Sequence, residues 1–73
     1  MSEYLVVIER EGESWAAYCP DLPGVGVAGD SQAEVEELIR EAVSFHIEGL
    51  RAAGEPVPVP TAVEVTRVEV PAA

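Results

Sequence analysis

Few side chains in this sequence could carry out chemistry, and they do not cluster. Cys19 is the single cysteine and His46 the single histidine. A reactive thiolate needs a cation or a helix N-terminus nearby. Nothing next to Cys19 supplies one, so we interpret it as a small, partly buried hydrophobic residue. His46 lies on an apolar stripe without a second ligand at metal-binding spacing, which favours a packed core or interface histidine over a functional one.

The charge of the chain restricts its partners. Fourteen acidic residues stand against four basic ones, all arginines, which gives a formal net charge of −10. Phosphate binding requires several cationic contacts and anionic membranes attract basic segments, so neither nucleic acid nor a membrane is expected as a direct partner. The acids are densest over residues 34–41, which form either a solvated helix face or a docking surface for a basic partner. No carboxylate spacing typical of a metal site stands out. We therefore expect no metal, no cofactor and no catalytic residue, and hence no enzyme.

The length of 73 residues allows one domain, which we place over residues 1–73 with a core at about 4–70. Hydrophobic residues make up 48% and charged residues 25% of the chain, which is typical of a globular protein. No apolar run approaches the ~20 residues that span a bilayer, and the first residues do not resemble a signal peptide. We expect a cytoplasmic protein.

Three short strands are predicted before the helix. Tyr4–Ile8 is apolar and β-branched. After a turn at Glu11–Glu13, Ser14–Tyr18 has the character of the returning strand of a hairpin. A loop rich in proline and glycine at residues 21–24 then leads to a weaker strand at Val25–Ala28.

One long helix is the clearest element. Ser31 followed by Glu34 matches a capping box, and apolar residues recur at helical spacing up to Ala53. Gly54 fits the position after a helix C-terminus, and three prolines make Glu55–Pro60 an extended connector. The helix residues expected to face the sheet are Leu38, Ile39, Ala42 and Leu50.

A fourth strand is predicted at Ala62–Val70. Its valines change parity between residues 65 and 68, so the two pairs point to opposite faces unless a bulge intervenes. A right-handed crossover from the helix places this strand parallel to the first one. The predicted fold is therefore a two-layer α+β domain, β-β-β-α-β, with one helix packed on a four-stranded sheet of order 3-2-1-4.

Two apolar surfaces exceed what a lone monomer of this size can hide. One is the exposed edge of the fourth strand, and the other is a helix stripe wider than a small sheet covers. We expect a dimer or a higher even-numbered homo-oligomer. The predicted contact residues are Phe45, Ile47, Val68 and Val70.

Several motifs in a fixed order resemble the HicB-like antitoxin family of toxin–antitoxin systems. They begin with Pro20-Asp21-Leu22-Pro23-Gly24, Gly29-Asp30-Ser31 and Glu41-Ala42. They continue with His46-Ile47-Glu48-Gly49-Leu50 and Gly54-Glu55-Pro56-Val57-Pro58, so the resemblance covers about residues 4–61.

The resemblance implies a partial RNase H-like fold and a role in silencing a small, basic, RNA-cleaving toxin of the HicA type. Family members usually add a C-terminal DNA-binding domain. Because this sequence ends at Ala73, we expect no such domain and no direct binding to DNA. The contact with the toxin is predicted at Tyr18, Asp21, Leu22 and Pro23, where acidic and apolar side chains adjoin.

Two other hypotheses remain open. The chain could be an orphan of the family that has no toxin and associates mainly with itself. It could also be a degenerate metal-dependent nuclease with RNase H geometry, for which Glu9, Glu64 and Glu69 are candidates by position.

Overall fold

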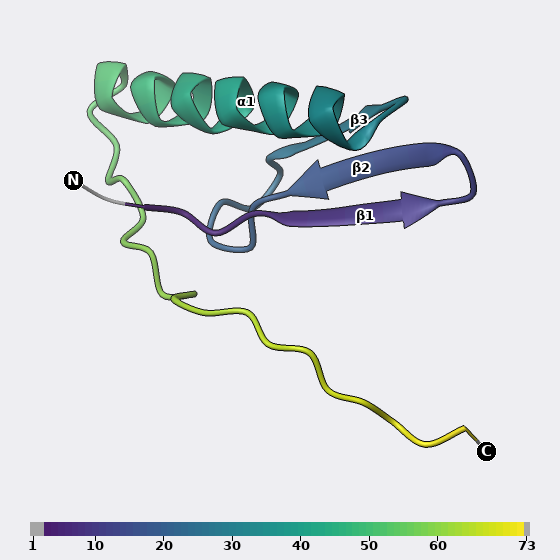
Figure 1. Ribbon diagram of the computed structural model, residues 1–73. Helices are drawn as coiled ribbons and strands as arrows, with labels where there is room; N and C mark the ends of the chain where they lie inside the picture. The colour runs from purple at the N-terminus through teal and green to yellow at the C-terminus, as the bar shows by residue number, and fades with distance from the viewer. Residues whose placement is uncertain (1–2, 73) are drawn as a thin grey trace.

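The computed structural model describes residues 3–72. One helix lies across a three-stranded antiparallel sheet, which makes the architecture α+β (Figure 1). The strands are β1 (Val7–Glu11), β2 (Ser14–Tyr18) and β3 (Gly26–Gly29), and the helix is α1 (Gln32–Ala52). The strands neighbour one another in chain order, β1-β2-β3. The predicted fold class, the helix and the three-stranded meander are thus confirmed.

A tight turn at Gly12 joins β1 to β2. Gly12 has a φ of +62°, a left-handed conformation that glycine adopts without strain. The Arg10 Nε donates a hydrogen bond to the Gly12 carbonyl (3.0 Å), and the Arg10 guanidinium lies 5.6 Å from the ring centroid of Trp15. One arginine therefore supports both the turn and a cross-strand cation–π contact.

The first strand begins at Val7 instead of the predicted Tyr4. Val7 is paired with Tyr18, the last residue of β2. The chain turns away at Pro20, which has no N–H to donate to a ladder. The residues before Val7 therefore have no neighbour in β2, although they remain half-buried.

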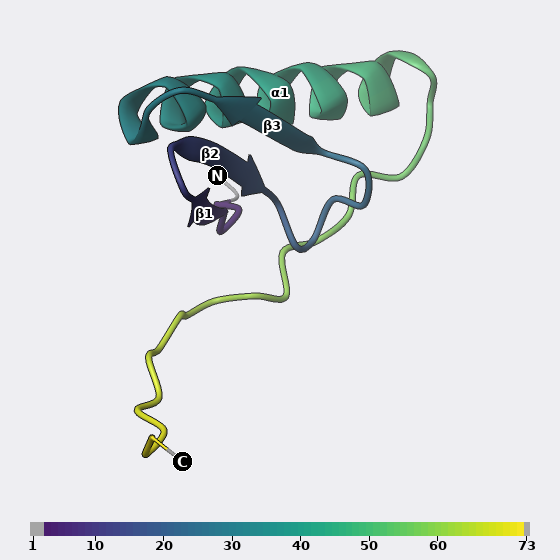
Figure 2. The same ribbon diagram turned by 90° about the vertical axis from the view of Figure 1, so that its right-hand side faces the viewer.

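One face of the sheet is covered by α1 and the other is open (Figure 2). Ile8, Ala17 and Val27 are cross-strand partners on the covered face. Tyr18 lies on the open face, because successive side chains in a strand alternate. The helix packs mainly over β3 and β2 and much less over β1, so the β1 side of the covered face is left partly uncovered.

The ends of α1 agree with the sequence pattern. The Glu34 N–H donates to Ser31 Oγ (3.1 Å), and Glu34 Oε1 accepts a hydrogen bond from the Asp30 N–H (3.0 Å). This reciprocal arrangement satisfies two backbone donors at the helix start. At the other end Gly54, with a φ of +70°, closes a Schellman motif. Both predicted caps are confirmed.

The core lies between α1 and the sheet and includes the loop that follows β2. Its buried residues are Ala17, Cys19, Leu22, Val25, Val35, Ile39 and Ile47. Of the helix residues predicted to face the sheet, Ile39 belongs to this core and Ala42 packs against it. Leu38 and Leu50 are half-buried and lie outside this cluster, because the buried stripe runs through Val35 and Ile47 instead.

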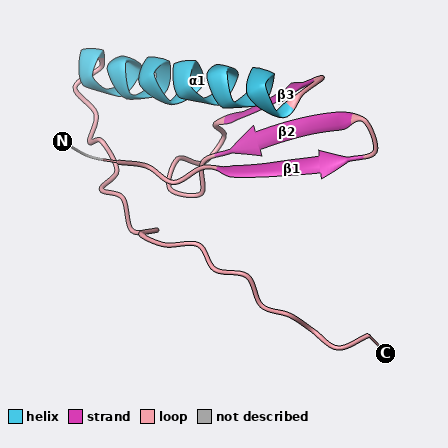
Figure 3. Cartoon of the chain, in the orientation of Figure 1, coloured by secondary structure: helices cyan, strands magenta, loops and turns pink. Residues whose placement is uncertain are grey.

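The predicted fourth strand at Ala62–Val70 is not formed. In the part of the chain that the structure describes, no strand follows Pro60, and the sheet lacks the fourth position of the 3-2-1-4 order. The segment 63–72, called the tail below, runs extended and away from the sheet (Figure 3). Strand formation requires a partner for the backbone groups, and none is beside the tail among the described residues. The radius of gyration is consequently 14.3 Å, against about 11 Å for a compact domain of this length.

Candidate partner-binding surfaces

The loop at residues 19–25 between β2 and β3 is held by its own hydrogen bonds. The Leu22 N–H donates to the Cys19 carbonyl and the Val25 N–H to the Leu22 carbonyl, both at 3.1 Å. The Cys19 N–H donates in turn to the Val25 carbonyl at 3.2 Å. Leu22 is 0% exposed. In the single chain its side chain supports the loop from within the core, and its role as a partner contact remains a prediction.

Asp21 makes its contacts within the chain. Its carboxylate accepts hydrogen bonds from the Thr61 hydroxyl (2.7 Å), the Ala62 N–H (3.1 Å) and the Thr61 N–H (3.2 Å). These bonds, the one from the Thr61 hydroxyl foremost, favour the charged form. They lower the pKa of Asp21 below its ordinary value of 3.8. Asp21 thus connects the loop to Thr61 and Ala62, the two residues directly before the tail. Asp21 and Thr61 are 40 positions apart in the sequence.

The exposed side of the same loop brings other predicted contact residues together. Tyr18 and Pro23 both line a shallow hollow of about 440 Å³ formed by the loop and the adjoining strand ends. Tyr18 is 42% exposed and lies on the open face of the sheet, while Pro23 is exposed beside it. This loop surface presents an aromatic ring and a proline on a rigid backbone.

The exposed surface of the first half of α1 is acidic. Glu36, Glu37 and Glu41 are all exposed. Arg40 Nη1 lies 3.0 Å from Glu37 Oε2, an exposed pair of a kind that contributes little to stability. The acids outnumber the single arginine on this stretch, which leaves a net negative surface of the sort that attracts a cationic protein.

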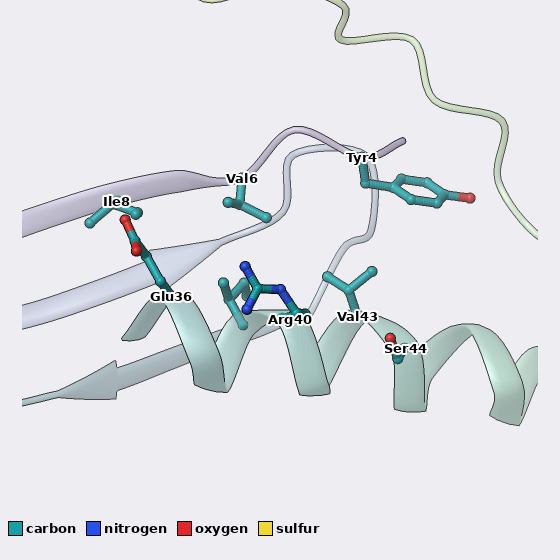
Figure 4. Close-up of a pocket in the computed structure, with 8 residues that line it drawn as sticks. Tyr4, Val6, Ile8, Glu36, Arg40, Val43 and Ser44 are labelled. Atoms are coloured by element: carbon teal, nitrogen blue, oxygen red, sulfur yellow. The ribbon is translucent and has the colours of Figure 1, made fainter. Parts of the chain in front are cut away.

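A groove runs between β1 and α1 where the helix leaves the sheet uncovered (Figure 4). Its volume is about 530 Å³. The side chains that line it are Tyr4, Val6, Ile8, Glu36, Ile39, Arg40, Val43 and Ser44. A second hollow of about 410 Å³ shares Tyr4, Val43 and Ser44 with it and extends toward Val57. No sequence pattern predicted this groove. The one signal for it is the alternation of apolar residues at positions 4, 6 and 8, which places their side chains on one side of the chain, where they line the groove.

The predicted oligomer contacts divide into two groups. Phe45 is 79% exposed, and Val68 and Val70 are exposed on the tail. Ile47 is buried in the core. The helix turns Ile47 toward the sheet and leaves Phe45 exposed, while the role of both as oligomer contacts remains a prediction.

The remaining candidate chemical residues lie apart. Glu9 is on β1, whereas Glu64 and Glu69 lie on the tail. Within residues 3–72 no group of three or more histidine, cysteine, aspartate or glutamate side chains is placed to hold a metal ion. Cys19 is a buried free thiol. Among the described residues, no helix combines the length and apolar character that crossing a membrane requires.

Comparison with known proteins points to one family. The family described as "HicB_like antitoxin of bacterial toxin-antitoxin system" matches residues 4–71. An uncharacterized 14.9 kDa protein of Haemophilus phage HP1, from the rep-hol intergenic region, is 38% identical over 55 residues. A UPF0150 protein of Synechocystis is 39% identical over 56 residues.

The relatives differ in how much of their length this chain covers. Each alignment includes 75% of the chain, but it spans 41% of the phage protein and 71% of the cyanobacterial one. No solved structure was found to match the chain.

Proposed function

Because the chain belongs to the HicB-like antitoxin family of bacterial toxin–antitoxin systems, we propose that it binds and neutralises a small, basic, RNA-cleaving toxin of the HicA type. The family match over residues 4–71 is the observation that carries this proposal. The proposed role is binding without catalysis, in the cytoplasm, where the RNA that such a toxin cleaves is found.

The charge of the chain supports a basic partner. A toxin that holds RNA phosphates needs a cationic surface, and this chain offers a formal net charge of −10 with an acidic face on α1. Complementary potentials speed encounter and disfavour wrong partners. At physiological salt, however, charges separated by more than ~8 Å are largely screened, so lasting affinity requires a packed contact as well.

We assign that packed contact to the loop surface. Tyr18 and Pro23 are exposed on a backbone fixed by three hydrogen bonds. Rigid aromatic side chains make effective anchors because little conformational entropy is lost when they are buried. In this proposal Asp21 and Leu22 support the loop surface without contacting the toxin. Asp21 is hydrogen-bonded to Thr61, and Leu22 fills the core beneath the loop.

The test is to look for a small basic protein encoded beside this chain, to co-express the two, and then to measure binding kinetics. The intact chain should restore growth, and added salt should slow association. Tyr18→Ala should speed dissociation by a factor of about 30, equivalent to about 2 kcal/mol for an interface anchor. Val59→Ala is the control, because Val59 is an exposed apolar residue of the connector, outside the loop surface.

Two results would contradict parts of this proposal. Failure of the intact chain to suppress the toxicity of the adjacent basic protein would remove the antitoxin assignment. Binding that is unchanged by Tyr18→Ala and by Pro23→Asp would remove the loop surface from the interface while leaving the antitoxin role in place.

We also propose that the chain forms a dimer or a higher even-numbered homo-oligomer. The exposed apolar residues Phe45 on α1 and Val68 and Val70 on the tail support this, because a second copy would remove such large apolar side chains from water. Self-association is also what remains if no toxin partner exists. Sedimentation that gives a monomer mass at high micromolar concentration would contradict it.

A further inference from the structure

We propose that residues 63–70 are the fourth strand of this fold and that a second copy of the chain receives them, beside its β1 and over its groove. The proposal specifies the surface of the self-association proposed above and rests on it. In the resulting dimer each copy donates its tail and accepts the other's.

The tail has the composition of a strand but no strand partner among residues 3–72. Val63 is 83% exposed and Val70 is 81% exposed, and the two valines between them are exposed as well. β-branched residues at this density are typical of strands. Four valines of the tail are exposed to water. We infer that a second chain supplies the surface that buries them.

The groove offers the complementary surface. β1 is an edge strand whose outer side is unpaired within the described sheet. Ile8 of β1 and Val6, which directly precedes the strand, form one wall of the groove, and Val43 lies on the helix opposite (Figure 4). A strand added next to β1 would send every second side chain into this groove. Two valines of the tail can therefore be buried there, at positions that α1 leaves uncovered.

The parity change within the tail fits a strand that is used on both faces. If Val63 and Val65 enter the groove, Val68 and Val70 point to the open face of the sheet. On that face they lie beside the half-buried Val7 of the edge strand β1. Both valine pairs would thus gain apolar neighbours.

The residues directly before the tail direct the tail toward a second copy. Asp21 accepts three hydrogen bonds from Thr61 and Ala62. The connector before these two residues contains prolines at positions 56, 58 and 60. Proline restricts the backbone and resists a sharp reversal. Beyond this point the chain leads away from its own β1 in both views (Figure 1, Figure 2). Exchange of an identical element between two copies lets each edge be covered in a closed, two-fold dimer.

The experiment combines sedimentation with cross-linking of the full chain. The unmodified chain should sediment as a dimer. Val65→Glu should raise the dissociation constant of the dimer by about tenfold or more, because in both grooves it replaces a valine packed against Val6, Ile8 and Val43 by a carboxylate. Val59→Glu is the matched control, since Val59 is equally an exposed valine but lies in the connector, before the tail. It should leave the dissociation constant unchanged.

Cross-linking then identifies the acceptor sheet. In a Cys19→Ala background, Glu9→Cys and Thr66→Cys are joined by a short bis-maleimide under native conditions. Strand exchange predicts covalent dimers on a denaturing gel. Cross-links within single chains would show that the tail closes on its own sheet, which overturns the proposal.

The remaining outcomes separate this proposal from the one on which it rests. A dimer that is unaffected by Val65→Glu overturns strand exchange but leaves self-association standing. A monomer at all concentrations overturns both. Neither result bears on toxin binding, which is measured separately with the loop variants.

Discussion

The body of this protein (residues 3–62) buries valine side chains in its core, whereas its tail exposes them. Val35 on α1 is 0% exposed, whereas Val63 on the tail is 83% exposed. Residue type does not account for the difference, because both are valines next to a glutamate. What differs is whether a second element of the same chain lies opposite. The comparison shows that burial in so small a domain depends on which surfaces the topology brings together.

The loop at residues 19–25 and the tail differ in the same way in their backbones. Three main-chain hydrogen bonds close the loop on itself, and Leu22 fills the space beneath it. The tail takes part in no strand pairing within the described chain. The loop is thus suited to present a rigid surface to a partner, and the tail is suited to become ordered against one.

The largest effect expected from this comparison is on Leu22. Leu22→Ala should lower the free energy of unfolding by about 2–5 kcal/mol, because it leaves a cavity in the core. Val63→Ala should change it by less than about 0.5 kcal/mol, since that side chain already contacts water. Urea titration at a concentration where the copies are separate measures both. Equal losses for the two variants would mean that the tail is packed in the monomer.

A smaller loss is expected from the cap of α1. Ser31→Ala removes the acceptor for the Glu34 N–H and should cost about 1 kcal/mol of unfolding free energy. Ser31→Asp, which retains an acceptor, is the control and should restore most of that loss. A Ser31→Ala chain as stable as the original would show that packing alone, and not the cap, determines where the helix starts.

The smallest effect concerns the junction between body and tail and depends on pH. Hydrogen bonds from Thr61 and Ala62 hold the pKa of Asp21 below its ordinary value of 3.8. A carboxyl whose pKa is lowered on folding stabilises the fold above its ordinary pKa. That contribution is lost as the pH falls through the lowered value. The amide resonances of Thr61 and Ala62 should therefore move toward unfolded positions only below about pH 3.8.

Asp21→Asn provides the control for that titration. The variant keeps the shape of the side chain but removes its charge, so the junction should no longer respond to acid. A transition of the same size in the variant would show that another acidic group controls the junction.

Much of the body followed from local patterns. The Ser31 and Glu34 pair, the glycine at position 54 and the helical spacing between them located α1, because caps and periodicity act over a few residues. The turn between β1 and β2 was located for the same reason. The order of motifs from Pro20 to Pro58 also identified the family, which the match over residues 4–71 supports.

The packing of residues that depends on distant neighbours could not be predicted from the sequence. Leu22 and Ile47 were expected at interfaces but lie in the core, since burial depends on which surface packs opposite. Asp21 was expected to meet a partner but holds Thr61, 40 positions away. No pattern within one segment reports such a contact.

The sequence by itself determined the elements of this protein: one capped helix, three short strands, an acidic charge and a valine-rich end. Propensity, capping and composition are properties of neighbouring residues, so they can be deduced before any fold is known. Tertiary structure alone decided that α1 covers β3 and β2 more fully than β1, and that a groove therefore opens beside Val6 and Ile8. It also decided that the valines after Ala62 lie outside the packed core of the monomer. A strand exists only where another strand accepts its hydrogen bonds, and that acceptor is a property of the assembled molecule.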